Sequence, residues 1–253
     1  MRSAVWNLTL GVFLVLLDGG AVGQTNRSGI GVESITFSGS FLHDVGLKAG
    51  EGLNGVRGFG GGVQVPFRLT PAFFLRAASV YADLEVDQDD AVNRWQWGFW
   101  DRFYREYVRD LQQRDPNYVA TLASMQRLHF IAVHLTAEIR LPLHIGIKPY
   151  LTSGVSLYRY ERTLTLHERW RKRFPELNYT YEYEYDNHAE DRVGTLFGVV
   201  GGIGGRMHVY RFVEIDLQGR YHRIVTGWSR REAYQYFPMK NFIDLSLGVV
   251  FMY

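Results

Sequence analysis

The chain has 253 residues, a formal net charge of +2 and no cysteine. Without cysteine there can be no disulfide framework and no thiolate metal site. So small a net charge argues against a nucleic-acid partner. The length suits one large all-β domain or two small ones, and the chain is rich in aromatic residues (15%) and in glycine (27 residues).

The N-terminus has the pattern of a secretory signal peptide. Arg2 precedes the apolar run Leu10–Leu17, and small residues lead to a possible cleavage point after Gly23. The apolar run is too short to span a bilayer as a helix. We therefore predict an export signal over residues 1–23 and a mature protein over residues 24–253.

The mature chain repeats a period of two, in which apolar and polar side chains alternate as in half-buried strands. In one segment Leu135 and Ile139 share a phase, whereas His134 and Glu138 share the other. The pattern predicts eight strands, within residues 33–42, 58–69, 72–82, 127–141, 147–160, 194–210, 212–225 and 242–253.

The connections between these strands alternate in length. The tight ones fall at residues 69–72, 142–146 and 209–212, and the long ones at 43–54, 85–127, 161–192 and 227–240. An up-and-down sheet with this rhythm places all short turns at one end and all long loops at the other, as in outer-membrane barrels.

The strand pattern alone fits both a soluble lipocalin-like barrel and a membrane barrel. The lopsided loops favour the membrane barrel, and so do aromatic residues near strand ends, where interfacial girdles form. The aromatic residues in question are Phe41, Phe73, Tyr81, Tyr150, Tyr158, Tyr160, Tyr210, Phe212 and Trp228.

The chain ends within its last strand, on alternating apolar residues that close with an aromatic: Leu247, Val249, Phe251 and Tyr253. This ending resembles the C-terminal assembly signal of small bacterial outer-membrane β-barrel proteins of the OmpA/OmpW-like type. The resemblance implies an all-β, eight-stranded antiparallel transmembrane barrel in the outer membrane. Its implied partners are outer-membrane lipid, lipopolysaccharide and the assembly machinery, with no cofactor.

Closure of the sheet is a physical requirement in lipid, because each unsatisfied backbone group in hydrocarbon costs several kcal/mol. Eight strands enclose an interior that side chains fill, so we predict a plugged polar lumen. Buried charges must pair or remain solvated in a small water-filled space. The predicted ion-pair network comprises Arg68, Arg76, Glu138, Arg140, Arg206, Glu214, Asp216, Arg220 and Asp244.

The long segment between the third and fourth strands holds an aromatic cluster and a predicted amphipathic helix over residues 101–113. The cluster comprises Trp95, Trp97, Trp100, Phe103, Tyr104 and Tyr107. It is either a helix that caps the barrel mouth or a surface that contacts a ligand, a sugar or lipid.

The next long segment pairs a basic stretch, residues 167–174, with an alternation of tyrosine and acid over residues 178–188. Opposite charges across a strand pair are stabilising. We therefore predict a hairpin that extends the barrel beyond the membrane.

These patterns favour a non-enzymatic surface protein with a structural, adhesive or ligand-binding role toward a partner not yet identified. A lipid A- or phospholipid-modifying enzyme would need a nucleophile beside a base, and pairs such as Ser156 with His167 have no motif support. A soluble binding barrel and an accessory subunit of a secretion machine are two further interpretations of the same patterns.

Overall fold

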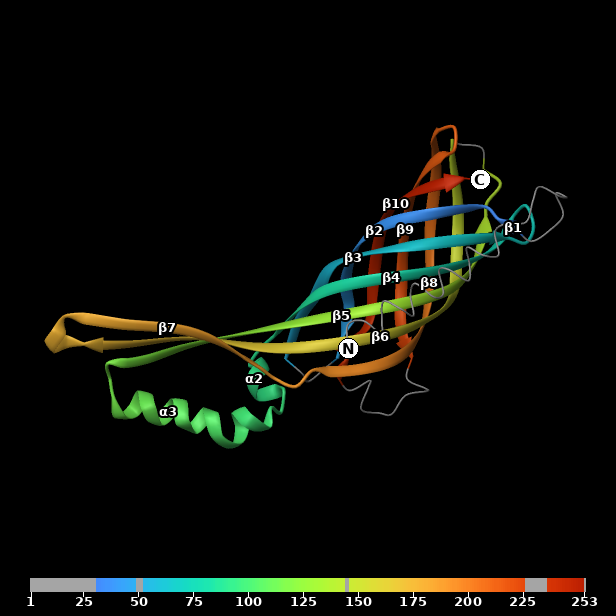
Figure 1. Cartoon of the computed structure of the whole chain (residues 1–253). Helices are drawn as coiled ribbons and strands as arrows, with labels where there is room; N and C mark the ends of the chain where they lie inside the picture. The colour runs from blue at the N-terminus through green and yellow to red at the C-terminus, as the bar shows by residue number, and fades with distance from the viewer. Residues whose placement is uncertain (1–30, 49–51, 144–145, 226–235, 253) are drawn as a thin grey trace.

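The computed structural model of the chain describes residues 31–48, 52–143, 146–225 and 236–252 (Figure 1). The predicted export signal, Trp228 and Tyr253 lie outside these ranges. The fold is almost entirely antiparallel strand.

Most elements of the chain are strands, and the α-helices lie between the fourth and the fifth strand. In chain order the elements are β1 (Gly31–Val32), β2 (Ser34–Leu47), β3 (Leu53–Arg68), β4 (Phe73–Gln88), α2 (Ala91–Arg94), a π-helical turn (Trp100–Tyr104), α3 (Arg105–Arg114), β5 (Tyr118–Arg140), β6 (Ile147–Phe174), a 3-10 turn (Pro175–Leu177), β7 (Tyr179–His188), β8 (Arg192–Tyr210), β9 (Val213–Val225) and β10 (Met239–Met252).

Eight of the strands in the described chain form a closed ring in the order β2, β3, β4, β5, β6, β8, β9, β10 and back to β2. The last strand pairs with the first of the ring, so that Leu247 lies opposite Gly39 and Phe251 opposite Ile35. The predicted eight-stranded up-and-down barrel is therefore confirmed. Within the described residues β1 pairs only with β3, and β7 pairs only with β6.

The two phases of each strand separate as predicted. The apolar phase faces outward, where Leu217 leaves 64% of its surface exposed, and Leu135 and Leu247 are similarly exposed. The charged phase faces inward, where Glu138 is fully buried and Arg220 nearly so. This rules out the soluble barrel, which would bury its apolar phase.

Glycine on the inner wall makes room for large side chains. A Cβ at Gly204 would overlap the buried Tyr150 ring, and one at Gly202 would lie 3.0 Å from Cγ of Arg220. Both positions lie on β8, opposite strands that carry bulky inward residues.

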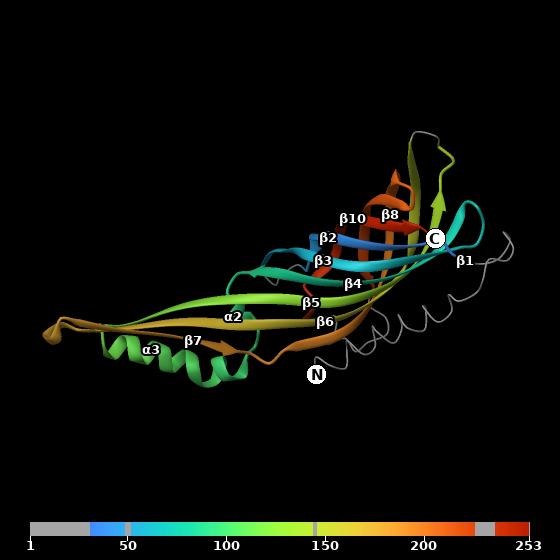
Figure 2. The same cartoon turned by 45° about the horizontal axis from the view of Figure 1, so that its top comes forward.

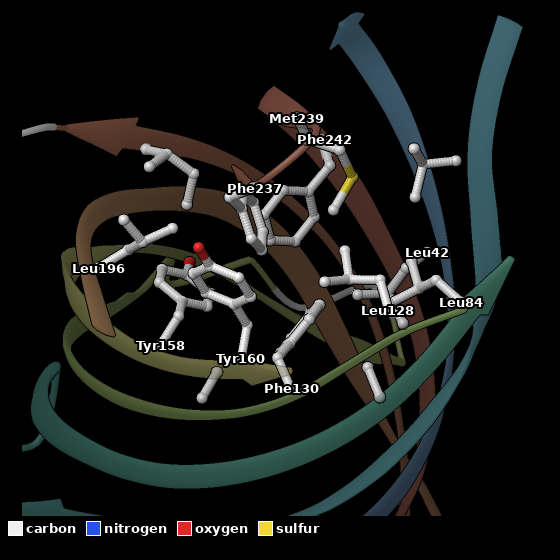
Figure 3. Close-up of a cluster of buried hydrophobic side chains, with 14 of the residues drawn as sticks. Leu42, Leu84, Leu128, Phe130, Tyr158, Tyr160, Leu196, Phe237, Met239 and Phe242 are labelled. Atoms are coloured by element: carbon white, nitrogen blue, oxygen red, sulfur yellow. The ribbon is translucent and has the colours of Figure 1, made fainter. Parts of the chain in front are cut away.

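The interior differs from the predicted polar lumen in its long-loop half, where a buried apolar and aromatic layer fills the barrel (Figure 3). Phe130, Tyr158, Phe237 and Phe242 meet there, with ring centroids 5.8–6.4 Å apart. The predicted place in the interfacial girdle is wrong for three aromatic residues. Tyr150, Tyr158 and Tyr160 point inward and are buried. They lie on the inward phase of β6, and proximity to a strand end does not determine the face.

Strands β5 and β6 run well beyond the barrel, where β7 joins them as a third strand (Figure 1). This three-stranded ribbon, which we call the extension, comprises residues 118–126 of β5, 162–174 of β6 and all of β7. The predicted loops 85–127 and 161–192 are therefore largely strand and helix. Helix α3 lies along one face of the extension, as Figure 2 shows.

Among the described residues, no helix has the length and apolar character needed to cross a membrane.

Candidate functional site

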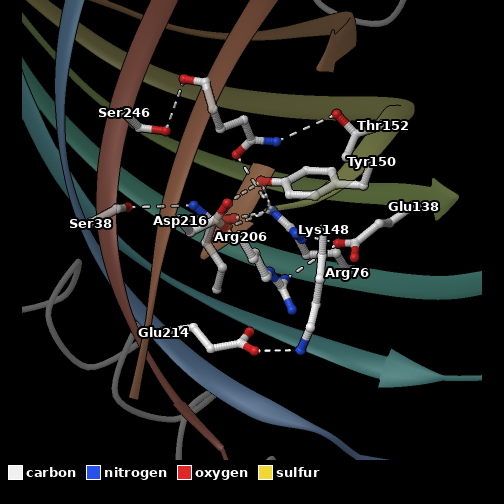
Figure 4. A network of polar contacts seen from close by, with 12 residues as sticks. Ser38, Arg76, Glu138, Lys148, Tyr150, Thr152, Arg206, Glu214, Asp216 and Ser246 are labelled. Atoms are coloured by element: carbon white, nitrogen blue, oxygen red, sulfur yellow. Dashed lines mark hydrogen bonds and ion pairs between the residues drawn. The ribbon is translucent and has the colours of Figure 1, made fainter. Parts of the chain in front are cut away.

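A buried ion network occupies the barrel interior near the short turns (Figure 4). Arg76 pairs with Glu138 and, at 3.7 Å, with Asp216. Arg206 lies 3.5 Å from Glu138 and 3.6 Å from Asp216. All four side chains are at most 3% exposed, so these pairs lie where an isolated charge would be most costly.

Further groups close this network. Arg140 donates to Glu138 at 2.9 Å and pairs with Glu33. The Tyr150 hydroxyl donates to Asp216 at 2.5 Å. The connected charges are thus three arginines and three acids in the described chain, which makes the network neutral. Sequence reasoning missed Glu33 and Tyr150 as members, because neither lies in a segment of clear alternating charge.

The other predicted network residues separate from this group. Glu214 pairs with Lys148 at 2.5 Å near the same end, and Arg220 pairs with Asp244 farther along the interior. Arg68 requires a correction, because it is exposed at the last residue of β3 and makes no ion pair with the described residues of the network. The strand ends at a turn there, so the guanidinium reaches water.

Two histidines line the middle of the interior beside the Arg220–Asp244 pair. His134 Nδ1 lies 2.6 Å from Ser156 Oγ, and His222 Nδ1 lies 2.8 Å from the Tyr158 hydroxyl. Ser156 is therefore not beside His167, which is exposed on the extension. Since Ser156 and His134 are buried inside the barrel, this pair does not face the membrane lipid.

A polar group around Arg162 lies inside the barrel at the long-loop end. Arg162 donates to Gln126 at 2.7 Å, to Gln88 at 2.9 Å and to the Tyr236 carbonyl at 3.0 Å. The Trp95 ring lies 5.1 Å from the Arg162 guanidinium. Trp95 therefore packs at the mouth, but the interpretation of the helix over residues 101–113 as a mouth cap is corrected, because this helix lies along the extension instead.

The extension has one charged face. Basic residues of β6 lie directly opposite acids of β7, as Arg169 with Glu184 and His167 with Asp186. Arg169 and Glu184 form an ion pair, and His167 Nδ1 lies 2.8 Å from Asp186. The predicted hairpin with opposite charges across it is confirmed.

The other face of the extension carries the helix, and the predicted helix over residues 101–113 is confirmed by the continuous helical stretch Trp100–Arg114. Trp100 packs against Val92 and the buried Leu166 of β6. Trp97 is partly buried beside it. Trp100 and Val108 are buried and Tyr104 bonds to β6, so the inward residues are spaced four apart, the pattern of an amphipathic helix.

A single carboxylate joins helix and strands. Glu168, fully buried on β6, accepts hydrogen bonds from the Tyr104 hydroxyl and the Trp170 indole, both at 2.8 Å, and from the Asn187 amide. The Tyr104 hydroxyl also contacts the Tyr185 hydroxyl of β7. Glu168 therefore links the π-helical turn, β6 and β7, and we call this set of contacts the Glu168 clamp.

Replacement of this carboxylate should loosen the extension without unfolding the barrel. We expect Glu168→Ala to leave the buried Trp170 indole N–H without its acceptor and to cost about 2 kcal/mol of local stability, since a buried unsatisfied group costs roughly 1–3 kcal/mol. Hydrogen exchange at amides of residues 164–174 measures this as faster exchange. Glu184→Ala, which removes an exposed carboxylate from the opposite face, should change the exchange little; equal effects would contradict the clamp.

The clamp also predicts a pH dependence. Burial raises the pKa of Glu168, although hydrogen bonds from Trp170 and Asn187 act in the opposite direction. An acid with a raised folded-state pKa contributes stability in full below its unfolded pKa of about 4.3, and that contribution is lost as the pH rises through the folded value. The stability difference between the native chain and Glu168→Ala should shrink from pH 4 to pH 7. Glu168→Gln cannot ionise and should abolish this trend.

We call five aromatic side chains of the helical stretch and of β7 the aromatic shelf: Phe103, Tyr107, Tyr181, Tyr183 and Tyr185. Phe103 is 67% and Tyr181 is 49% exposed. The tyrosines of β7 form a row, with ring centroids of Tyr183 5.6 Å from Tyr181 and 6.1 Å from Tyr185. The sequence identified the helical members of the shelf but not those on β7.

The predicted C-terminal assembly signal lies on the outer face of β10. Leu247, Val249 and Phe251 are all exposed there and pair with β2 and β9. Tyr253 is outside the described residues.

A closed eight-stranded barrel with an apolar outside, a neutralised ionic interior, short turns at one end and long structured segments at the other defines the class. The chain is a transmembrane β-barrel of the bacterial outer-membrane type.

Comparison with solved structures matches most of the chain to bacterial surface and outer-membrane proteins at low identity. Neisserial surface protein A shares 16% identity at a TM-score of 0.42, covering 88% of this chain and 99% of that one. A major outer membrane protein from Thermus thermophilus shares 10% at 0.43, covering 87% and 99%. The outer membrane protease OmpT from Escherichia coli shares 10% at 0.38, covering 91% and 99%.

No family model and no curated protein matches the chain.

Proposed function

We propose that this protein is a non-enzymatic surface-display barrel, in which the barrel is the membrane anchor and the extension is the part that contacts the outside. The observation that carries the proposal is the contrast between the two ends. The described interior holds an ion network near the short turns, an aromatic layer, and the polar contacts of Arg162 at the long-loop end. By contrast, β5, β6, β7 and α3 build an ordered projection beyond the long-loop end.

The reach of the extension supports this role. The outward apolar belt ends near Leu157, after which the exposed Arg159 and Glu161 follow on β6. From Arg159 to Phe174 there are fifteen steps along the strand, which span about 50 Å at roughly 3.3 Å each. With a strand tilt of about 35–45°, the tip stands roughly 35–40 Å above the lipid interface.

Cell-surface labelling tests this proposal, because the sequence has no native cysteine. We expect Met125→Cys, on the extension, to react with a membrane-impermeant maleimide on intact cells. Thr70→Cys, at a short turn, should react only after lysis. Labelling of Thr70→Cys but not of Met125→Cys on intact cells would invert the proposed orientation and overturn the function.

The filled interior supports a closed barrel. In a planar lipid bilayer we expect the purified protein to show no sustained channel, whereas a stable conducting state would favour transport instead.

Lipid and assembly partners are also proposed. A set of exposed cations lies just above the apolar belt and suits the phosphates of lipopolysaccharide: Arg57, Arg127, Arg159 and Arg223. The outer face of β10 suits the assembly machinery that the C-terminal resemblance implies.

A further inference from the structure

We propose that the aromatic shelf binds an uncharged saccharide chain by stacking. This inference rests on the proposed function, since it names the ligand class of the extension. Three features of the shelf limit the classes of ligand that it can bind. They are its exposed aromatic rings, the tyrosine hydroxyl groups at their edges, and the small net charge around them.

Four of the five shelf side chains are exposed, and Tyr183 between Tyr181 and Tyr185 is partly buried. The helix presents Phe103 and Tyr107 about one turn apart, both more than half exposed, beside the tyrosine row of β7. The two sides are joined, because Tyr104 stacks near Tyr107 at 5.9 Å and bonds to Tyr185. Rigid aromatic side chains give large contact area at low entropic cost, so the ligand must offer flat apolar faces.

The hydroxyl groups at the edge of the shelf have defined donor and acceptor roles. The Tyr104 hydroxyl donates its proton to Glu168, so in its contact with Tyr185 it can only accept. Tyr185 therefore donates to Tyr104, and its own lone pairs are left to accept from a ligand. Burial raises the pKa of the Tyr185 hydroxyl, so it stays protonated at neutral pH. A hydrocarbon chain has no group that could hydrogen-bond to this hydroxyl.

The charge around the shelf is nearly balanced. Three helix arginines each pair with an acid about one turn earlier: Arg105 with Asp101, Arg109 with Glu106 and Arg114 with Asp110. The acids of β7 lie on the opposite face of the strand. The remaining helix arginine, Arg102, lies over the Phe103 ring at 5.8 Å and can donate to a ligand. Without a strong field of either sign, a polyanion or polycation has little to bind.

A pyranose chain meets all three conditions, because each ring has an apolar C–H face and a rim of hydroxyls that donate and accept. The height of the extension above the interface argues against membrane lipid as the occupant. The row of rings at 5.6–6.1 Å would contact several successive sugar units.

Isothermal titration of the full chain in detergent micelles tests the proposal, with cellohexaose and maltohexaose as probes. We expect at least one of them to bind, and Tyr181→Ala to weaken that binding about tenfold, the scale of a lost aromatic contact. Tyr181→Phe, which keeps the ring, should retain most of the affinity. The matched control is Met125→Ala, an exposed residue on the opposite face of the extension, which should bind as the native chain does.

Three outcomes would overturn the inference: no binding of either hexasaccharide, binding that Tyr181→Ala leaves unchanged, or binding of sugar-free recombinant gelatin at Tyr181 while both sugars are inert. The last would reassign the shelf to a protein partner. Surface labelling of Met125→Cys separates these failures from failure of the proposed function, because a displayed extension that ignores sugars overturns only the ligand class.

Discussion

Glu138→Ala should destabilise the barrel more than any other single truncation of the interior. Glu138 pairs with Arg76, Arg140 and Arg206 and is fully buried. Its removal leaves three guanidinium groups around one lost carboxylate, and breaking a buried pair costs about 3–5 kcal/mol. We expect a loss of this size in the free energy of unfolding, measured by urea titration in lipid vesicles with tryptophan fluorescence.

The control for this prediction is an ion pair of this protein that is exposed to solvent. Asp83 and Arg127 lie 3.2 Å apart, and both are partly exposed on the outer face. Exposed pairs contribute less than about 1 kcal/mol, so Asp83→Ala should have a small effect. If Glu138→Ala cost no more than Asp83→Ala, the interior charges would be solvated rather than paired.

Leu217→Arg should have the second large effect. Leu217 is an outward residue within β9 and belongs to the apolar belt. An arginine on the lipid face near the bilayer midplane costs about 2–4 kcal/mol. We expect reduced assembly and a lower urea midpoint, seen also as loss of the unheated, faster-migrating band on a gel.

Leu177→Arg provides the comparison, because Leu177 is 74% exposed at the tip of the extension. In water an exposed leucine and an exposed arginine differ little in stability, so this variant should assemble normally. Equal tolerance of arginine at both positions would mean that the outer face of the barrel does not meet lipid.

The barrel itself could be predicted from sequence because the features that define it lie within single strands. Alternation with period two sets the face of each side chain, and charge then distinguishes Glu138 from Leu135. The hairpin of β6 and β7 was predictable for the same reason, since the charges of Arg169 and Glu184 are complementary. Strand number follows from counting such segments.

Other features depend on contacts between distant residues, which alternation does not determine. Glu33 meets Arg206 across 173 positions of sequence, and Tyr104 meets Tyr185 across 81. Residue type alone does not distinguish an inward tyrosine such as Tyr158 from a tyrosine of the interfacial girdle. The geometry of the barrel decides between them. The β7 members of the shelf and the Glu168 clamp were missed for this reason, although the helix and its aromatic residues were predicted.

The most direct test of the orientation of the two strand faces is spin-label accessibility in lipid vesicles, with single cysteines introduced into the cysteine-free chain. Labels at Leu135→Cys and Leu217→Cys should collide readily with dissolved oxygen and poorly with a water-soluble nickel complex. A label at Met125→Cys should show the reverse. High nickel accessibility at Leu135→Cys and Leu217→Cys would contradict a lipid-facing apolar belt and, with it, the membrane barrel.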